Sequence, residues 1–109
     1  MRIYAIIWNM KIVKELNKNE LTIKPVGEIN SVTAPELEEV IKNDLDGVDR
    51  LIFDFSELEY LSSAGLRVLL VAQRLMSKKG QMSVRHVNSS VMEILEITGF
   101  NNVLDIDAN

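Results

Sequence analysis

The spacing of hydrophobic residues changes along the chain, and these changes predict its secondary structure. Over residues 11–29, apolar side chains alternate with polar ones as in strands, and the segment from Asn17 to Asn19 suits a turn between two of them. Residues 50–58, RLIFDFSEL, contain a nearly continuous apolar run, which is typical of a strand buried on both faces. Residues 81–87, QMSVRHV, predict a further strand.

Three other segments have the spacing of amphipathic helices, at residues 33–45, 66–76 and 90–99. Thr33 and Glu36 stand three residues apart at the start of the first helix, and Ser90 and Glu93 do the same at the start of the last. A hydroxyl and a carboxyl with this spacing can each accept a hydrogen bond from a free amide, so both pairs predict a capping box. Gly99 is expected to end the last helix.

The predicted order is ββαβαβα, with a possible short last element in NVLDI, residues 102–106. Strands alternate with helices after residue 33, which favours an α/β fold with parallel strand pairs and helices packed on the sheet. A chain of 109 residues is long enough for one core only. We expect a single domain over residues 10–109, preceded by an N-terminal extension over residues 1–9.

The extension, MRIYAIIWN, contains an apolar patch that ends at Trp8 and is followed by a second methionine, Met10. The patch is shorter than the roughly 20 residues that a membrane-spanning helix needs. The plain interpretation is an extra edge strand or a disordered tail. Self-association through Trp8 is the alternative, and Met10 is a second candidate start.

Composition excludes several classes of function. The formal net charge is −4, with 16 acidic and 12 basic residues, so neither nucleic acid nor an anionic membrane is an expected partner. The chain has no cysteine, which rules out disulfides and zinc–thiolate sites. The lack of cysteine also fits a reducing compartment, and we expect a cytoplasmic protein.

The sequence contains no arrangement typical of a catalytic or cofactor site. His86 is the single histidine, so it lacks a second imidazole for metal binding, and we interpret it as an ordinary residue near a strand end. The nucleophile elbow, the phosphate-binding loop and the dinucleotide fingerprint are all missing. Paired carboxylates such as Glu57 and Glu59 are expected on solvated faces. We predict no catalytic residues, no metal and no cofactor.

Two adjacent serines interrupt the apolar pattern in EYLSSAGLRVLL, residues 59–70. Ser62 and Ser63 lie at the predicted turn between a buried strand and the next helix, where either can cap the helix. One serine suffices for that purpose. The helix that follows is apolar almost all round, so it is either buried or presents an apolar stripe to a partner. A phosphate on a serine at its first turn would add about −1.5 to −2 charges and could expel a docked partner.

Three segments resemble the STAS domain of bacterial anti-sigma factor antagonists. They are GEIN at residues 27–30, LIFDFSELEYLSSAGLRVLL at 51–70 and VMEILEITGFNNVLDI at 91–106. The resemblance covers about residues 10–107 and implies a STAS fold, a mixed sheet of about four or five strands flanked by about four helices. It also implies regulation of transcription through protein–protein contacts rather than an enzymatic activity.

In this family, the unphosphorylated antagonist binds an anti-sigma factor that is also a serine kinase of the histidine-kinase-like ATPase type. The resemblance implies that this kinase phosphorylates Ser63, and that a PP2C-type phosphatase reverses the reaction. Ser62 stands where the family has Asp, which makes Ser62 a competing acceptor. Asn30 likewise stands where the family often has Asp.

The loop from Asn30 to Thr33 is expected beside the serine turn, where both would contribute to the partner surface. The residues expected to bind the partner are Asn30, Ser31, Thr33, Leu61, Ser62, Ser63, Ala64, Gly65, Leu66 and Arg67. The alternative is a STAS adaptor or scaffold, in a stress complex or a lipid transporter, that binds partners without a phospho-switch. A small-ligand or nucleotide-binding domain is a third option, which the lack of a phosphate loop disfavours.

Overall fold

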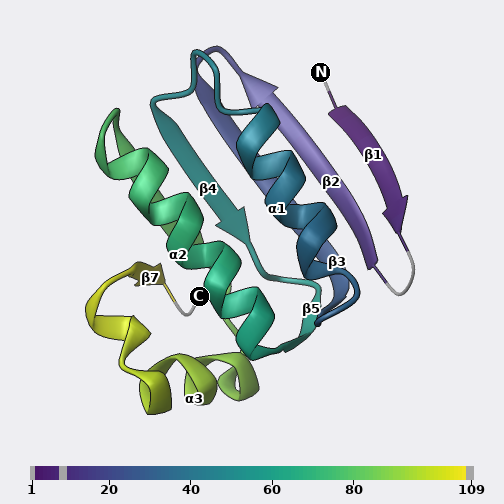
Figure 1. Cartoon of the computed structure of the whole chain (residues 1–109), viewed down its shortest axis with the longest axis vertical. Coiled ribbons are helices and arrows are strands. Elements are labelled where there is room, and N and C mark those ends of the chain that lie inside the picture. Colours follow the sequence, from purple (N-terminus) through teal and green to yellow (C-terminus); the bar gives the residue numbers. More distant parts are fainter. Residues whose placement is uncertain (1, 8–9, 108–109) are drawn as a thin grey trace.

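The chain forms a mixed β-sheet, and two helices lie across one face of this sheet (Figure 1). The computed structural model describes residues 2–7 and 10–107. The strands are β1 (Arg2–Ile7), β2 (Met10–Asn17), β3 (Glu20–Ile29), β4 (Arg50–Asp54), β5 (Leu58–Leu61), β6 (Gln81–Arg85) and β7 (Asp105–Asp107). The helices are α1 (Ala34–Asn43), α2 (Ser63–Ser77) and α3 (Ser89–Thr98), followed by the 3-10 turn η1 (Phe100–Asn102).

The long strand β3 pairs with three other strands, β2, β4 and β5. The sheet order is β1-β2-β3-β4-β6-β7, and β5 pairs separately with β3. β1, β2 and β3 pair antiparallel, whereas β4, β5, β6 and β7 join in parallel. The first half of β3 pairs with β4 and its last three residues pair with β5. The carboxyl ends of β3 and β5 therefore lie side by side.

The α/β class and the STAS architecture expected from the sequence are confirmed, with differences in detail. The described residues form seven strands rather than four or five. β5 and β7 have only four and three residues, too few for a periodic pattern to reveal them. The helices are three α-helices and one 3-10 turn instead of about four helices.

The core lies between the sheet and the helices α1 and α2. Leu51 and Phe53 of β4 point to the helices and are fully buried, while Ile52 points to the opposite face with 7% of its surface exposed. The expectation of a strand buried on both faces is thus confirmed. The apolar side of α2 also packs inward, since Val68 and Leu69 are buried. Most hydrophobic residues of this helix belong to the core, whereas Leu70 and Val71 are half-buried and Leu75 is 37% exposed.

The start of α3 differs from the prediction. Asn88, rather than Ser90, is the N-cap, and its Oδ1 accepts a hydrogen bond from the Val91 amide at 2.8 Å. The side-chain amide of Asn88 also donates to the Leu58 carbonyl of β5 at 2.9 Å. This tertiary contact holds Asn88 at the helix start, so the capping box of Ser90 and Glu93 is wrong. Gly99 ends the helix in a left-handed conformation, as expected.

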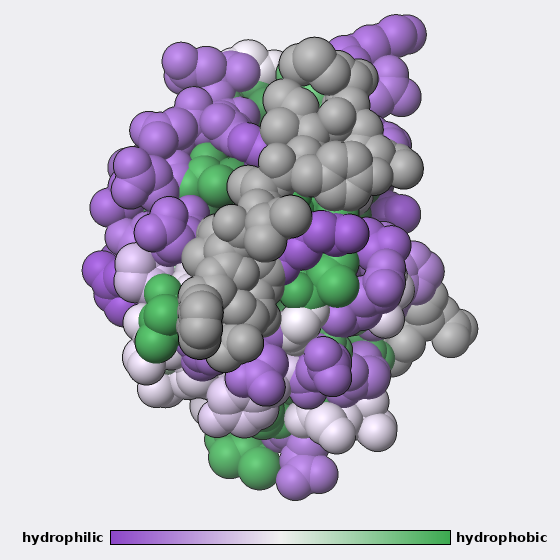
Figure 2. Space-filling view, turned by 90° about the vertical axis from the view of Figure 1, so that its right-hand side faces the viewer, coloured by the Kyte–Doolittle hydropathy of each residue, from purple (hydrophilic) through white to green (hydrophobic). Residues whose placement is uncertain are grey.

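Residues of the expected N-terminal extension form the edge strand β1. β1 runs antiparallel to β2, with Ile7 opposite Met10. This matches the interpretation as an extra edge strand. Trp8 lies outside the described residues, so self-association through Trp8 stays a prediction, as does the domain boundary at residue 10. In Figure 2, the coloured surface on this side of the molecule is mainly hydrophilic, with small, separated hydrophobic groups.

Candidate functional site

Two loops meet where β3 and β5 end. The β3–α1 loop covers residues 30–33, and the β5–α2 turn is made by Ser62. The Ser62 amide donates a hydrogen bond to the Ile29 carbonyl at 2.8 Å, which joins the turn to the end of β3. Because the two strands are parallel neighbours, both helices begin at this edge of the sheet, where ligand and partner sites gather in α/β folds. The predicted proximity of the two loops is confirmed.

Asn30 shapes the β3–α1 loop. Its Oδ1 accepts hydrogen bonds from the amides of Val32 at 2.9 Å and Thr33 at 3.1 Å, and its Nδ2 donates to Glu28 Oε1 at 3.3 Å. An aspartate here would keep the two acceptor contacts but would repel the Glu28 carboxylate. The asparagine therefore fits this chain better than the aspartate frequent in the family.

Thr33 is fully buried and does not cap α1 with its side chain. Its Oγ1 donates to the Glu28 carbonyl at 2.8 Å and accepts from the Asn30 amide at 2.8 Å. A buried hydroxyl needs such partners, and β3 and the β3–α1 loop supply one each. The capping box predicted for Thr33 and Glu36 is therefore wrong. The first amide of α1, that of Ala34, is instead satisfied by the Asn30 carbonyl.

The two serines have different roles. Ser62 is the N-cap of α2, and its Oγ accepts a long hydrogen bond of 3.4 Å from the Gly65 amide. Ser63 is the first helical residue and is exposed. Among the described residues, no group forms a hydrogen bond with the Ser63 hydroxyl. One serine therefore holds the helix start, and the other presents a free hydroxyl beside it.

Gly65 lets α2 approach the sheet closely. A Cβ at this position would lie 2.4 Å from Leu61 Cδ1 and 2.8 Å from Ile29 Cγ2. Distances this short are far inside van der Waals contact, so a side chain here would push the helix away from β3 and β5. The glycine thus allows the start of α2, next to the serine turn, to pack closely against β3 and β5.

The residues expected to bind a partner divide into two groups by burial. Ser31, Ser63 and Arg67 are exposed, and Asn30, Ser62 and Ala64 are half-buried. The other four belong to the interior, namely Thr33, Leu61, Gly65 and Leu66. These four support the surface from below and cannot be its direct contacts in this conformation.

Sequence reasoning missed two exposed hydrophobic residues near the serine turn. Val32 of the β3–α1 loop is 60% exposed and Tyr60 of β5 is 48% exposed. Tyr60 pairs with Glu28 across the two strands, which places it at the same edge of the sheet. An apolar residue in a polar loop was the available signal for Val32. Tyr60 had no comparable signal, because the alternation of so short a strand is ambiguous.

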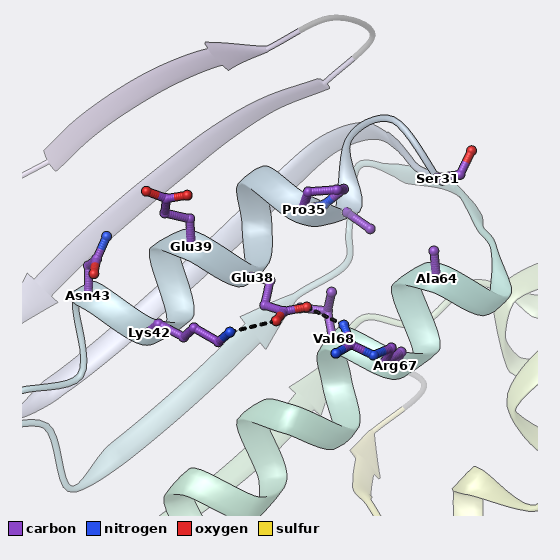
Figure 3. Close-up of a pocket in the computed structure, with 10 residues that line it drawn as sticks. Ser31, Pro35, Glu38, Glu39, Lys42, Asn43, Ala64, Arg67 and Val68 are labelled. Atoms are coloured by element: carbon purple, nitrogen blue, oxygen red, sulfur yellow. Dashed lines mark hydrogen bonds and ion pairs between the residues drawn. The ribbon is translucent and has the colours of Figure 1, made fainter.

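A groove of about 520 Å³ lies between α1 and α2 and extends to Ser31 and Ala64, next to the serine turn (Figure 3). Its lining residues are Ser31, Ala34, Pro35, Glu38, Glu39, Lys42, Asn43, Ala64, Arg67 and Val68. Glu38 bridges the two helices, since its carboxylate binds Arg67 Nη1 of α2 and, at 2.9 Å, Lys42 Nζ of α1. The hydrogen bond from Lys42, helped by the one from Arg67, lowers the pKa of Glu38 below its usual value.

The described residues, 2–7 and 10–107, contain neither a candidate metal site nor a candidate membrane-spanning helix. No group of three or more His, Asp or Glu side chains in this part of the chain could hold a metal ion. No helix there is long and apolar enough to cross a membrane. His86 is exposed directly after β6, as an ordinary strand-end histidine would be.

Known proteins are similar to this chain in sequence. BtrV of Bordetella bronchiseptica, described as a candidate anti-sigma factor antagonist, is 38% identical over 82 residues, 73% of this chain and 71% of its own. The anti-sigma-B factor antagonist of Bacillus subtilis is 26% identical over 102 residues, 92% of this chain and 93% of its own. These relatives are bacterial proteins.

A solved structure and a family profile agree with these relatives. The crystal structure of an anti-sigma factor antagonist from Mycobacterium paratuberculosis has a TM-score of 0.83 and 25% identity, over 92% of this chain and 86% of its own. The profile of the STAS domain matches residues 11–109. Anti-sigma factor antagonists are not enzymes, in agreement with the expected lack of catalysis. The chain belongs to the STAS domain family, among the anti-sigma factor antagonists.

Proposed function

We propose that this chain is an anti-sigma factor antagonist whose binding is switched by phosphorylation of Ser63. In its unphosphorylated form it binds an anti-sigma factor that is also a serine kinase, of the histidine-kinase-like ATPase type. The functional domain is residues 10–109, and residues 1–9 are an extension. The observation that carries the proposal is the exposed Ser63 hydroxyl at the start of α2, free of hydrogen bonds among the described residues, beside the capping Ser62.

The switch is a phosphoryl transfer from ATP. The bond between the Ser63 Oγ and the γ-phosphorus forms while the bond between that phosphorus and the β–γ bridging oxygen breaks. ADP leaves, and the hydroxyl proton passes to a base of the kinase. A PP2C-type phosphatase reverses the modification by hydrolysis, in which water replaces the serine oxygen on phosphorus and releases inorganic phosphate.

Ser63 is a better acceptor than Ser62 for a structural reason. The Ser62 oxygen accepts a hydrogen bond from the Gly65 amide, and loss of such a cap costs about 1 kcal/mol of folding stability. A phosphate on Ser63 leaves that contact in place, and the free amides at the helix start favour an anion nearby. The fold is therefore retained in both states.

The surface around Ser63 suits a partner that distinguishes the two states. Val32 in the β3–α1 loop and Tyr60 of β5, two residues before Ser62, are exposed hydrophobic side chains at the same edge of the sheet. A hydrophobic partner surface docked here would have to bury a new dianion next to it after phosphorylation. Burial of an unpaired charge is strongly unfavourable, so the partner is released.

Site-mapped mass spectrometry of protein purified from its own host tests the proposal. We expect one phosphate on Ser63 in a fraction of the molecules, and none in Ser63→Ala. Ser62→Thr is the matched control, because threonine keeps a capping hydroxyl and should leave the modification unchanged. Phosphate that persists in Ser63→Ala would contradict the site. No phosphate under any growth condition would favour an adaptor without a phospho-switch.

A further inference from the structure

Ser63 and Arg67 occupy the same face of α2. They are four residues apart in the helix, the spacing at which side chains of a helix meet. Helical side chains lean toward the N-terminus, so the Arg67 guanidinium can reach the turn where Ser63 lies. Both residues are exposed, and 68% of the Arg67 side chain is accessible. Arg67 is therefore free to move without disturbing the core.

Arg67 now pairs with a carboxylate that has a second cation. Glu38 of α1 binds Arg67 and Lys42 together, and the three side chains meet in the groove between the helices (Figure 3). The Glu38 side chain is only 15% exposed, so it depends on its partners more than Arg67 does. If Arg67 leaves, Lys42 still neutralises Glu38.

We propose that Arg67 is the internal counter-ion of phosphorylated Ser63 and exchanges Glu38 for the phosphate. The proposal rests on the proposed phosphorylation of Ser63. A phosphate carries up to two charges and three acceptor oxygens, and a guanidinium can bind it through two parallel hydrogen bonds. Glu38 offers one charge that it already shares with Lys42. The phosphate is therefore the stronger partner for Arg67.

The exchange would also change the charge and the ion pairs of the groove between α1 and α2. With Arg67 drawn to the phosphate, Glu38 loses one of its two cations, and α1 and α2 lose the ion pair that bridges them. The groove then becomes more negative in the region lined by Glu38 and Glu39. A partner that reaches from the serine turn into the groove would meet a changed surface at both places.

Phosphorus NMR on protein with genetically encoded phosphoserine at position 63 tests the exchange. We would compare the titration of the phosphate in the otherwise unchanged protein, in Arg67→Gln and in Arg74→Gln. Arg74 is an exposed arginine of the same helix, two turns further on, and is the matched control. We expect the second pKa of the phosphate to be lower, by about half a pH unit, with Arg67 present than in Arg67→Gln. Arg74→Gln should match the unchanged protein.

A second measurement follows Glu38 by carbon NMR of its carboxyl group. The pKa of Glu38 should rise toward its usual value when Ser63 carries phosphate. Equal phosphate titrations in all three proteins, or a Glu38 titration unaffected by phosphate, would overturn the exchange. Because the phosphoserine is encoded, this outcome is independent of any kinase. Ser63 could then still be the physiological site, whereas failure of phosphorylation in the host would contradict only the proposed function.

Discussion

Helices α1 and α2 begin side by side at one edge of the sheet, but the polar side chains at their first turns differ in where they form hydrogen bonds. At α1, Asn30 and Thr33 direct their hydrogen bonds back into the loop and to β3. At α2, Ser62 caps the helix while the hydroxyl of Ser63 faces outward. The first loop is closed by its own hydrogen bonds, and the second keeps one reactive group exposed.

The difference shows how a small domain can combine rigidity with a modifiable site. The closed loop provides a fixed neighbour, to which the Ser62 amide is tied through the Ile29 carbonyl. The capping and the exposed hydroxyl belong to different residues, so chemistry at Ser63 does not remove a contact that holds the helix. Substitutions in the two loops should therefore have very different effects on stability.

Thr33→Val should have the largest effect. Valine has nearly the same shape but removes the hydroxyl that binds the Glu28 carbonyl and the Asn30 amide in a fully buried position. We expect a loss of about 2–3 kcal/mol in the free energy of unfolding, measured by urea denaturation. Thr98→Val is the control, because the Thr98 hydroxyl bonds to the Ile94 carbonyl at an exposed helix end. Equal losses for both variants would contradict the role of Thr33.

Gly65→Ala should come next. The new methyl group would collide with Leu61 and Ile29, and overpacking of this kind costs about 1–3 kcal/mol. Alanine is the better helix former by about 1 kcal/mol, so we expect a net loss of up to about 2 kcal/mol in the urea experiment. The amide signals of Ile29 and Ser62 should also shift in the NMR spectrum. A stabilised variant would show that the sheet and helix can separate freely here.

Ser62→Ala and Ser63→Ala compare the two serines directly. Loss of the cap in Ser62→Ala should cost about 1 kcal/mol in the free energy of unfolding. Ser63→Ala should stay within about 0.5 kcal/mol of the parent, because an exposed side chain without a hydrogen bond is removed. Thermal or urea denaturation of the pair measures both values. The reverse order would assign the cap to Ser63.

Glu38→Gln should have the smallest effect, and the effect should depend on pH. Because Lys42 and Arg67 lower the pKa of Glu38 in the folded protein, the carboxylate stabilises the fold above its usual pKa. That contribution is lost as the pH falls through the folded pKa. The difference in urea midpoint between the parent and Glu38→Gln should therefore be larger at pH 7 than at pH 3. Glu39→Gln, at the neighbouring exposed position, serves as the control.

The position of the serine turn and the helices could be predicted because their signals are local. The apolar run of β4, the helical spacing after Ser63 and the terminal Gly99 each depend on a few neighbouring residues. The caps were harder to predict. Thr33 bonds to the nearby Glu28 carbonyl instead of capping α1. Asn88 caps α3 in place of Ser90, because it also bonds to the Leu58 carbonyl of β5, 30 residues away along the chain.

The sequence by itself determined the α/β order, the family and the presence of two serines at a strand–helix turn, since periodicity and short motifs are properties of contiguous residues. The tertiary structure decided which serine caps α2, which expected contact residues are buried, and that Arg67 pairs with Glu38, 29 residues away. Hydrogen bonds and burial depend on which groups the folded sheet and helices bring together, and sequence spacing alone contains no such distances.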